Sequence, residues 1–186
     1  MPACSILLDS SSYFRLAQNI HPLLKVSINN QGACLGIIDE LQQEYKRSPR
    51  LQHKFYWVNQ VKYIAERKGC FKLTRKLLQE VELMVPFMKN YAIEAGLGVS
   101  NVDLTMIAYA YALKIPVVTD DEDMIKLAGE YKIKAFSTLE ILKIMLDGIF
   151  IDMDIVRMIT AHWKYQKDIP KAFVEDYIRI FGVSPP

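Results

Sequence analysis

Short apolar runs that end next to acids, separated by long helical stretches, limit what this chain can fold into. The run "CSILLD" ends at Asp9, and "VVT" follows Pro116 and leads into the four acids of "DDED". Short continuous apolar runs are typical of strands buried on both faces of a parallel sheet. Because helical segments fill the sequence between them, the pattern predicts an α/β fold, a three-layer α/β/α sandwich around a central, mainly parallel sheet.

The remaining elements are predicted from apolar spacing and from capping residues. Leu35, Ile38, Leu41 and Tyr45 are spaced as on one face of a helix. Ser100 and Asp103 resemble the capping box that begins a helix. We expect helices over 11–20, 33–45, 51–95 with breaks near Gly69 and Pro86, 100–114, 122–132 and 137–147, an edge strand over 133–137, and two further helices separated at Pro170. Residues 1–147 would form one domain that includes a basic helical arm over 46–95, and residues 148–186 would form a C-terminal helical extension.

The net charge of +2 conceals a basic segment between Lys46 and Lys76, which holds ten basic residues and one acid, Glu66. A basic segment on an otherwise acidic chain predicts a polyanionic partner. The alternative is a solvated helical face. Our candidates for nucleic-acid contacts are Lys46, Arg47, Arg50 and Lys54, while the nearby aromatic residues Tyr56, Trp57 and Tyr63 either stack on unpaired bases or pack between helices.

Acids lie where a parallel sheet binds ligands, at the carboxyl ends of its strands. Asp9 ends the first strand, and the acids after Val118 follow a later strand. Asp103 lies in the first turn of the helix that precedes this later strand. Each acid could instead have a purely structural role. Asp9 could be a turn residue, Asp103 could be a helix cap, and Glu40 could be an exposed surface residue. Several carboxylates in one pocket would bind a hard cation such as Mg²⁺ or Mn²⁺.

No basic leader precedes the first apolar run, and no uncharged apolar run is long enough to span a membrane. The three cysteines have no paired metal spacing and are expected to be reduced thiols. These features predict a cytoplasmic protein with no membrane partner.

Four blocks of the sequence resemble the PIN-domain family: "ILLDSSSYF", "IIDELQQ", "NVDLTMIAYAYALKIPVVTDDEDM" and "IKAFSTLEIL". The resemblance covers roughly residues 5–147. It implies a metal-dependent nuclease, similar to the toxin ribonucleases of bacterial toxin–antitoxin pairs. A haloacid-type phosphatase is disfavoured, because it would have a second acid at the position of Ser11.

Carried over by position, the resemblance implies catalytic and metal-binding roles for Asp9, Glu40, Asp103 and Asp121, with Asp123 as an auxiliary metal ligand and with Ser11 and Thr119 as supporting hydroxyls. The implied reaction is Mg²⁺- or Mn²⁺-dependent hydrolysis of RNA, with DNA left open as a substrate. A cognate antitoxin and a homodimer are further implied partners. The alternative is a PIN-like module that binds RNA or a protein without cutting.

Overall fold

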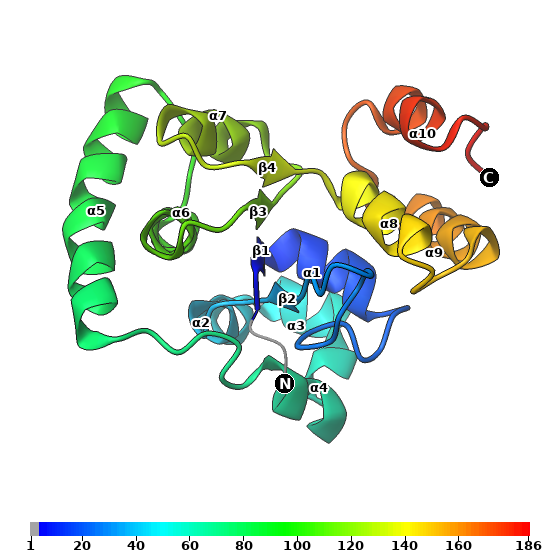
Figure 1. Cartoon of the computed structure of the whole chain (residues 1–186), viewed down its shortest axis with the longest axis horizontal. Helices are drawn as coiled ribbons and strands as arrows, with labels where there is room; N and C mark the ends of the chain where they lie inside the picture. Colours follow the sequence, from blue (N-terminus) through cyan, green and yellow to red (C-terminus); the bar gives the residue numbers. More distant parts are fainter. Residues whose placement is uncertain (1–3) are drawn as a thin grey trace.

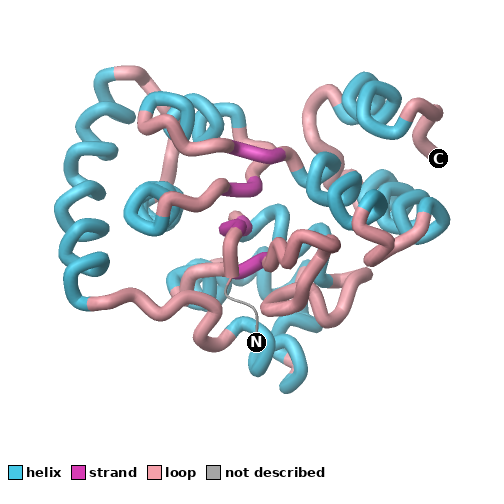
Figure 2. Tube along the Cα trace, in the orientation of Figure 1, coloured by secondary structure: helices cyan, strands magenta, loops and turns pink. Residues whose placement is uncertain are grey.

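The structure of the chain, a computed structural model, describes residues 4–186, and the side chains of all of these except 42–44. At its centre lies a four-stranded, all-parallel sheet in the order β2-β1-β3-β4. Helices cover both faces of this sheet (Figures 1 and 2). The α/β fold with a parallel sheet is confirmed, and the layering is compatible with a three-layer sandwich.

The strands are short, and the longest of the helices between them is α5. In chain order, the elements are β1 (Ile6–Leu8), α1 (Ser10–Ala17), β2 (Leu35–Gly36), α2 (Glu40–Arg47), α3 (Pro49–Lys54), the 3₁₀ helix η1 (Tyr56–Asn59), α4 (Val61–Arg67), α5 (Arg75–Glu94), α6 (Asn101–Leu113), β3 (Val117–Val118), α7 (Glu122–Glu130), β4 (Ala135–Phe136), α8 (Thr138–Asp147), α9 (Met153–Tyr165) and α10 (Phe173–Phe181).

Alternate residues of the strands point into two separate apolar cores. Ile6, Leu8 and Val118 belong to a core formed with α1, α8, α9, α10 and the segment around η1. Leu7 and Val117 belong to the opposite core, formed with α5, α6 and α7. Because neighbouring side chains of a strand face opposite ways, both faces of the sheet must be apolar. This accounts for strands whose residues are all buried, such as the three of β1.

Three expectations about secondary structure are wrong. The helical stretch 51–95 is interrupted not only near Gly69 but also after Lys54, where the 3₁₀ helix η1 follows. Residues 33–45 do not form one helix, because Leu35 and Gly36 pair with β1 as strand β2 before α2 begins at Glu40. The apolar spacing was misleading because Leu35, Ile38 and Leu41 are all buried in this strand–turn–helix arrangement as well. Pro86 does not interrupt a helix but lies inside α5. The edge position of β4 is confirmed.

Between residues 46 and 67, the basic segment packs three of its aromatic side chains into the core. Phe55, Trp57 and Tyr63 are buried in the core on the α1 side of the sheet, and Trp57 and Tyr63 make an edge contact with a centroid distance of 4.6 Å. Packing is therefore the role of these two aromatic residues, whereas Tyr56 is 73% exposed.

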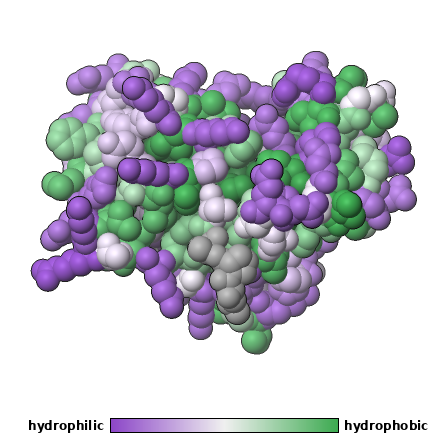
Figure 3. All heavy atoms as spheres, in the orientation of Figure 1, coloured by the Kyte–Doolittle hydropathy of each residue, from purple (hydrophilic) through white to green (hydrophobic). Residues whose placement is uncertain are grey.

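Helix α5 lies on the outer flank of the molecule, against α6 (Figure 1). Leu83 and Phe87 of this helix are 66% and 65% exposed, and apolar side chains reach the surface over α5 in Figure 3. The homodimer implied by the resemblance remains a prediction.

Tertiary packing brings two of the three cysteine thiols together. Cys4, just before β1, and Cys34, just before β2, have their Sγ atoms 3.7 Å apart. Hydrogen bonding to Cys34, together with burial, raises the pKa of Cys4 to about 11. No helix within residues 4–186 is both long and apolar enough to cross a membrane.

The C-terminal helices share the core of the sheet. Val156, Ile159 and Trp163 of α9 and Tyr177 of α10 are buried in the same core as Leu8, and Trp163 Nε1 donates to the carbonyl of Arg15 at 3.0 Å. Residues 148–186 thus pack onto the domain that precedes them.

Gly148, at the start of this extension, packs against the loop before β2, and Gly148→Ala is expected to destabilise the fold by about 1–3 kcal/mol. An added Cβ would lie 2.6 Å from Asn29 Cα and 2.8 Å from the carbonyl oxygen of Ile28, both backbone atoms. The control is Gly129→Ala in α7, where no atom lies within 4 Å and the change should stabilise by about 0.5–1 kcal/mol. Urea unfolding measures both. Equal stability of Gly148→Ala and wild type would contradict this packing.

Candidate functional site

A cleft of about 210 Å³ lies at the carboxyl ends of β1 and β3. The chain leaves these neighbouring strands for opposite sides of the sheet, since β2 lies beyond β1 and β4 lies beyond β3. Such a reversal of strand order is where open parallel sheets bind ligands. The cleft is lined by Asp9, Ser11, Arg15, Asp120, Asp121, Ile169, Pro170 and Lys171.

Asp9 is a buried carboxylate at the first position after β1. Its side chain caps α1, with Oδ1 accepting a hydrogen bond from the Ser12 amide at 2.6 Å, and the residue is 5% exposed. Burial, with a smaller repulsion from Asp120, raises the pKa of Asp9 to about 6, although hydrogen bonds from Thr119 and Ser12 oppose the shift. A carboxyl group with such a pKa in a cleft is a candidate cation ligand or proton acceptor.

Asp120, one of the four consecutive acids, is neutralised by the protein itself. Its Oδ2 lies 2.6 Å from Arg15 Nη1, and its Oδ1 accepts from the Thr138 amide at 2.9 Å. Arg15 also contacts Asp168 at 3.1 Å, and Lys54 contacts Asp168 at 2.9 Å. Burial would raise the pKa of Asp168, but Lys54 and Arg15 outweigh it and hold that pKa below its usual range.

Asp121 is the N-cap of α7. Its Oδ1 accepts from the amides of Asp123 at 2.9 Å and Met124 at 3.0 Å. The Thr119 hydroxyl, which is fully buried, accepts from the Asp121 amide at 3.1 Å. Asp121 is exposed and lines the cleft with Asp9, so two of the sequence-predicted acids meet there.

The other two acids of the run make surface contacts. Glu122 pairs with Lys171 at 3.0 Å. Asp123 accepts from the Gly98 amide at 2.9 Å and pairs with Lys126 at 3.1 Å, and these two partners, the amide first, lower its pKa. Each acid of "DDED" therefore has its own protein partner, which explains how like charges are tolerated in sequence.

Asp103 and Glu40 do not line this cleft. Asp103 completes the capping box of α6, accepting from the Ser100 amide at 2.8 Å. Glu40 begins α2, and its buried Oε2 has no hydrogen-bond partner among the described residues. Burial, aided by Glu40 and Asp39, raises the pKa of Tyr109 in α6, so Glu40 lies beside that helix. Within the described part of the chain, no three or more His, Cys, Asp or Glu side chains form a group that could hold a metal.

Several cleft residues were not predicted from the sequence. Arg15 and Asp120 are 105 positions apart, and the lining residues Ile169, Pro170 and Lys171 belong to the C-terminal extension. No local sequence pattern predicts the Arg15–Asp120 pair or the contribution of the C-terminal extension to the cleft. Of the predicted nucleic-acid contacts, Lys46, Arg47 and Arg50 are exposed, whereas Lys54 pairs with Asp168.

Comparisons with protein-family models, curated proteins and solved structures found no match for this chain. The fold and the site define its class by themselves: an α/β protein with a four-stranded parallel sheet and a cleft at the carboxyl edge that holds acids and bases together.

Proposed function

We propose that this protein is a Mg²⁺- or Mn²⁺-dependent phosphodiester hydrolase that cuts RNA. The observation that carries the proposal is the meeting of Asp9 and Asp121 with Arg15 and Lys171 in one cleft at the strand-order reversal. Two acids supply ligands for a cation, and Lys171, whose ion pair is exposed, supplies positive charge for a phosphate, while Arg15 is held by Asp120 and Asp168. The similarity to PIN-domain blocks supports the same reaction.

The donor set of the cleft fits a largely hydrated ion. Mg²⁺ usually keeps several waters and is held by one or two carboxylates together with substrate phosphates. Asp9 and Asp121 would hold it, with the Ser11 hydroxyl beside them. When bound, such an ion lowers the pKa of a water and polarises a phosphate oxygen.

The chain's own residues prepare the cleft for a phosphodiester. The α1 N-terminus holds Asp9 in place through the Ser12 amide, and the Asp120–Arg15 pair keeps the Arg15 guanidinium at the cleft wall. Lys171 is 81% exposed in its pair with Glu122. Such exposed pairs are worth little, so Lys171 is available to an incoming phosphate. Asp103, which lines no part of this cleft, serves as a cap.

The test is cleavage of a single-stranded RNA with Mg²⁺ or Mn²⁺ and with chelator. Asp121→Asn should keep the helix cap, because Asn caps as well as Asp, yet lower cleavage by more than about 100-fold, or about 2.7 kcal/mol of transition-state stabilisation. Asp103→Asn is the matched control, with cleavage within a few-fold of wild type.

Cleavage that persists in chelator, or in Asp121→Asn, would refute the proposal. RNA that is bound but never cut would favour the second candidate, a binding module. The observation on its side is that no group of three metal-ligand side chains occurs in the described part of the chain.

A further inference from the structure

A second and larger cleft, of about 680 Å³, opens at the carboxyl end of β2. Its walls come from the β2–α2 connection, the end of α2, η1 and α4 with the loop that follows it. Its volume lies within the range of about 300–1,000 Å³ that is typical of small-molecule sites. The secondary-structure pattern did not indicate it, because residues 33–45 were expected to be one helix.

The floor of this β2 cleft is apolar. Half-buried Ile64 of α4 is its most exposed branched side chain, because Ile37 and Ile38 are only 3% and 4% exposed and pack into the two opposite cores. An apolar floor of this kind accepts the face of a flat ring.

The rim of the β2 cleft is basic. Lys46 and Lys68 are exposed there, and Arg67, which is buried and donates to Tyr13 Oη at 3.2 Å, adds a third positive charge below them. Within the part of the chain that the structure describes, neither lysine takes part in an ion pair. Exposed lysines beside an apolar floor favour a ligand that carries both a ring and a phosphate.

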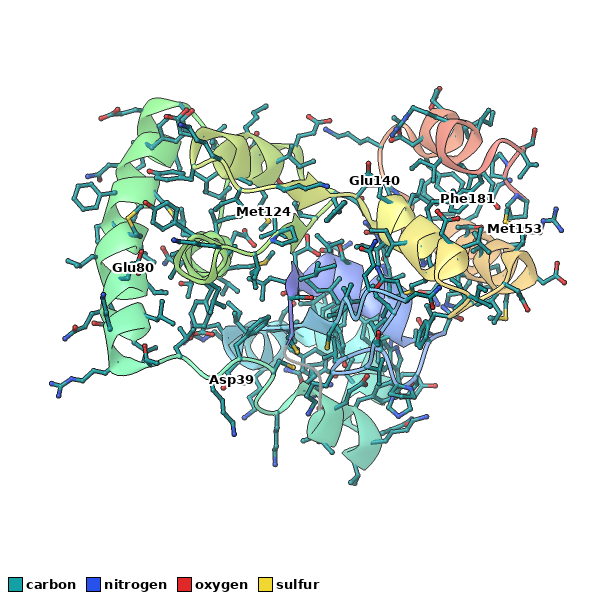
Figure 4. All side chains as sticks on the ribbon, viewed as in Figure 1. Asp39, Glu80, Met124, Glu140, Met153 and Phe181 are labelled. Carbon is teal, nitrogen blue, oxygen red and sulfur yellow. The ribbon has the colours of Figure 1, made fainter. Side chains whose placement is uncertain are left out.

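Two polar groups complete the lining. Asn59 is oriented by its Nδ2 atom, which donates to Tyr45 Oη at 3.3 Å, while Tyr45 in turn donates to the carbonyl of Phe55 at 3.2 Å. Asp39, exposed at the mouth and labelled in Figure 4 beside α2, is an acceptor that would repel phosphate but bind a sugar hydroxyl. A side-chain amide can hydrogen-bond the edge of a base, and a carboxylate can accept hydrogen bonds from the hydroxyls of a ribose. These two groups therefore suit a ribonucleotide.

The β2 cleft lies on the same edge of the sheet as the cleft of Asp9 and Asp121. Strands β2 and β1 are parallel neighbours, with Leu7 opposite Gly36, and β1 neighbours β3. Adjacent strands are about 4.8 Å apart. A single-stranded RNA that crosses this edge of the sheet would therefore contact both clefts.

We propose that the β2 cleft is a ribonucleotide-binding subsite, with the base on Ile37, Ile38 and Ile64, the phosphate at Lys46 and Lys68, and the ribose at Asp39. That the subsite lies beside a bond to be cut rests on the proposed nuclease function. That the subsite binds a nucleotide does not depend on that function. The subsite would hold one nucleotide of single-stranded RNA, independently of any metal.

The experiment is calorimetric titration of the full chain with adenosine 5′-monophosphate in chelator. Charge reversal of both lysines, Lys46→Glu with Lys68→Glu, should weaken binding by more than about tenfold. Ile64→Trp, which fills the cleft without changing its charge, should do the same. The matched control is Lys89→Glu, which reverses the charge of an exposed lysine in α5. This variant should bind the nucleotide with the affinity of wild type.

Two further ligands test the assigned chemistry. Inorganic phosphate should bind at least about tenfold more weakly than the nucleotide, because it leaves the apolar floor empty, and the 2′-deoxy nucleotide should bind more weakly than the ribonucleotide. Equal affinity for inorganic phosphate, or unchanged nucleotide affinity in both cleft variants, would overturn the subsite.

The outcome separates the subsite from the nuclease proposal. Nucleotide binding by the Asp121→Asn variant, together with no cleavage of RNA by wild type, would keep the subsite and refute the nuclease. Cleavage by wild type with no lysine-dependent nucleotide binding would refute the subsite alone.

Discussion

Asp9→Asn is expected to raise the free energy of unfolding at pH 8, in chelator, by about 3 kcal/mol. Burial lifts the pKa of Asp9 from 3.8 to about 6, and each pKa unit corresponds to about 1.36 kcal/mol. Because the folded protein binds this proton more tightly than the unfolded chain, wild-type stability should fall as the pH rises from about 4 to about 6 and then stay level. The neutral Asn side chain has no buried charge to destabilise the fold, and its oxygen can still accept the hydrogen bond from the Ser12 amide.

The measurement is urea unfolding of both proteins from pH 3 to pH 8. The two should be equally stable at pH 3, where Asp9 is protonated, and diverge through the window between the two pKa values. Asp152→Asn is the matched control, because Asp152 caps α9 from an exposed position. Added Mg²⁺ should stabilise wild type more than Asp9→Asn, since the folded site would bind it. An Asn variant that is less stable at pH 8 would show that the ionised carboxylate is well compensated.

Arg15→Met is expected to destabilise the fold by about 3–5 kcal/mol. Removing one partner of a buried ion pair leaves the other charge uncompensated, and the side chains of Arg15 and Asp120 are only 12% and 9% exposed. Asp168 would lose one of its two cations as well. The core around α1 would keep its apolar contacts, so the loss is electrostatic.

A double-mutant cycle measures this coupling. Adding Asp120→Asn to Arg15→Met should recover part of the lost stability, because the buried charge is then removed. Arg157→Met is the control, since its pair with Asp154 is exposed, at 54% and 89%, and such pairs are worth no more than about 1 kcal/mol. If Arg15→Met cost no more than Arg157→Met, the buried pair would have no role in holding the cleft.

The sequence by itself determined the features that depend on neighbours three or four positions away. The capping box of Ser100 and Asp103, the apolar strands before Asp9 and Thr119, and the helices that begin beside them follow from local hydrogen bonds and from apolar spacing. The carboxyl ends of two parallel strands must share one edge, which is why the meeting of Asp9 and Asp121 was predictable.

Only the tertiary structure decided which acids remain open to a ligand. Asp120 and Asp121 are adjacent, chemically identical and both line the cleft, yet Asp120 is paired with Arg15 from α1, whereas Asp121 caps its own helix α7. The C-terminal loop supplies Lys171 and Asp168, and strand β2 replaces the expected helix and opens the second cleft. These outcomes depend on which side chains packing brings together from distant parts of the chain, and no pattern within a few residues carries that information.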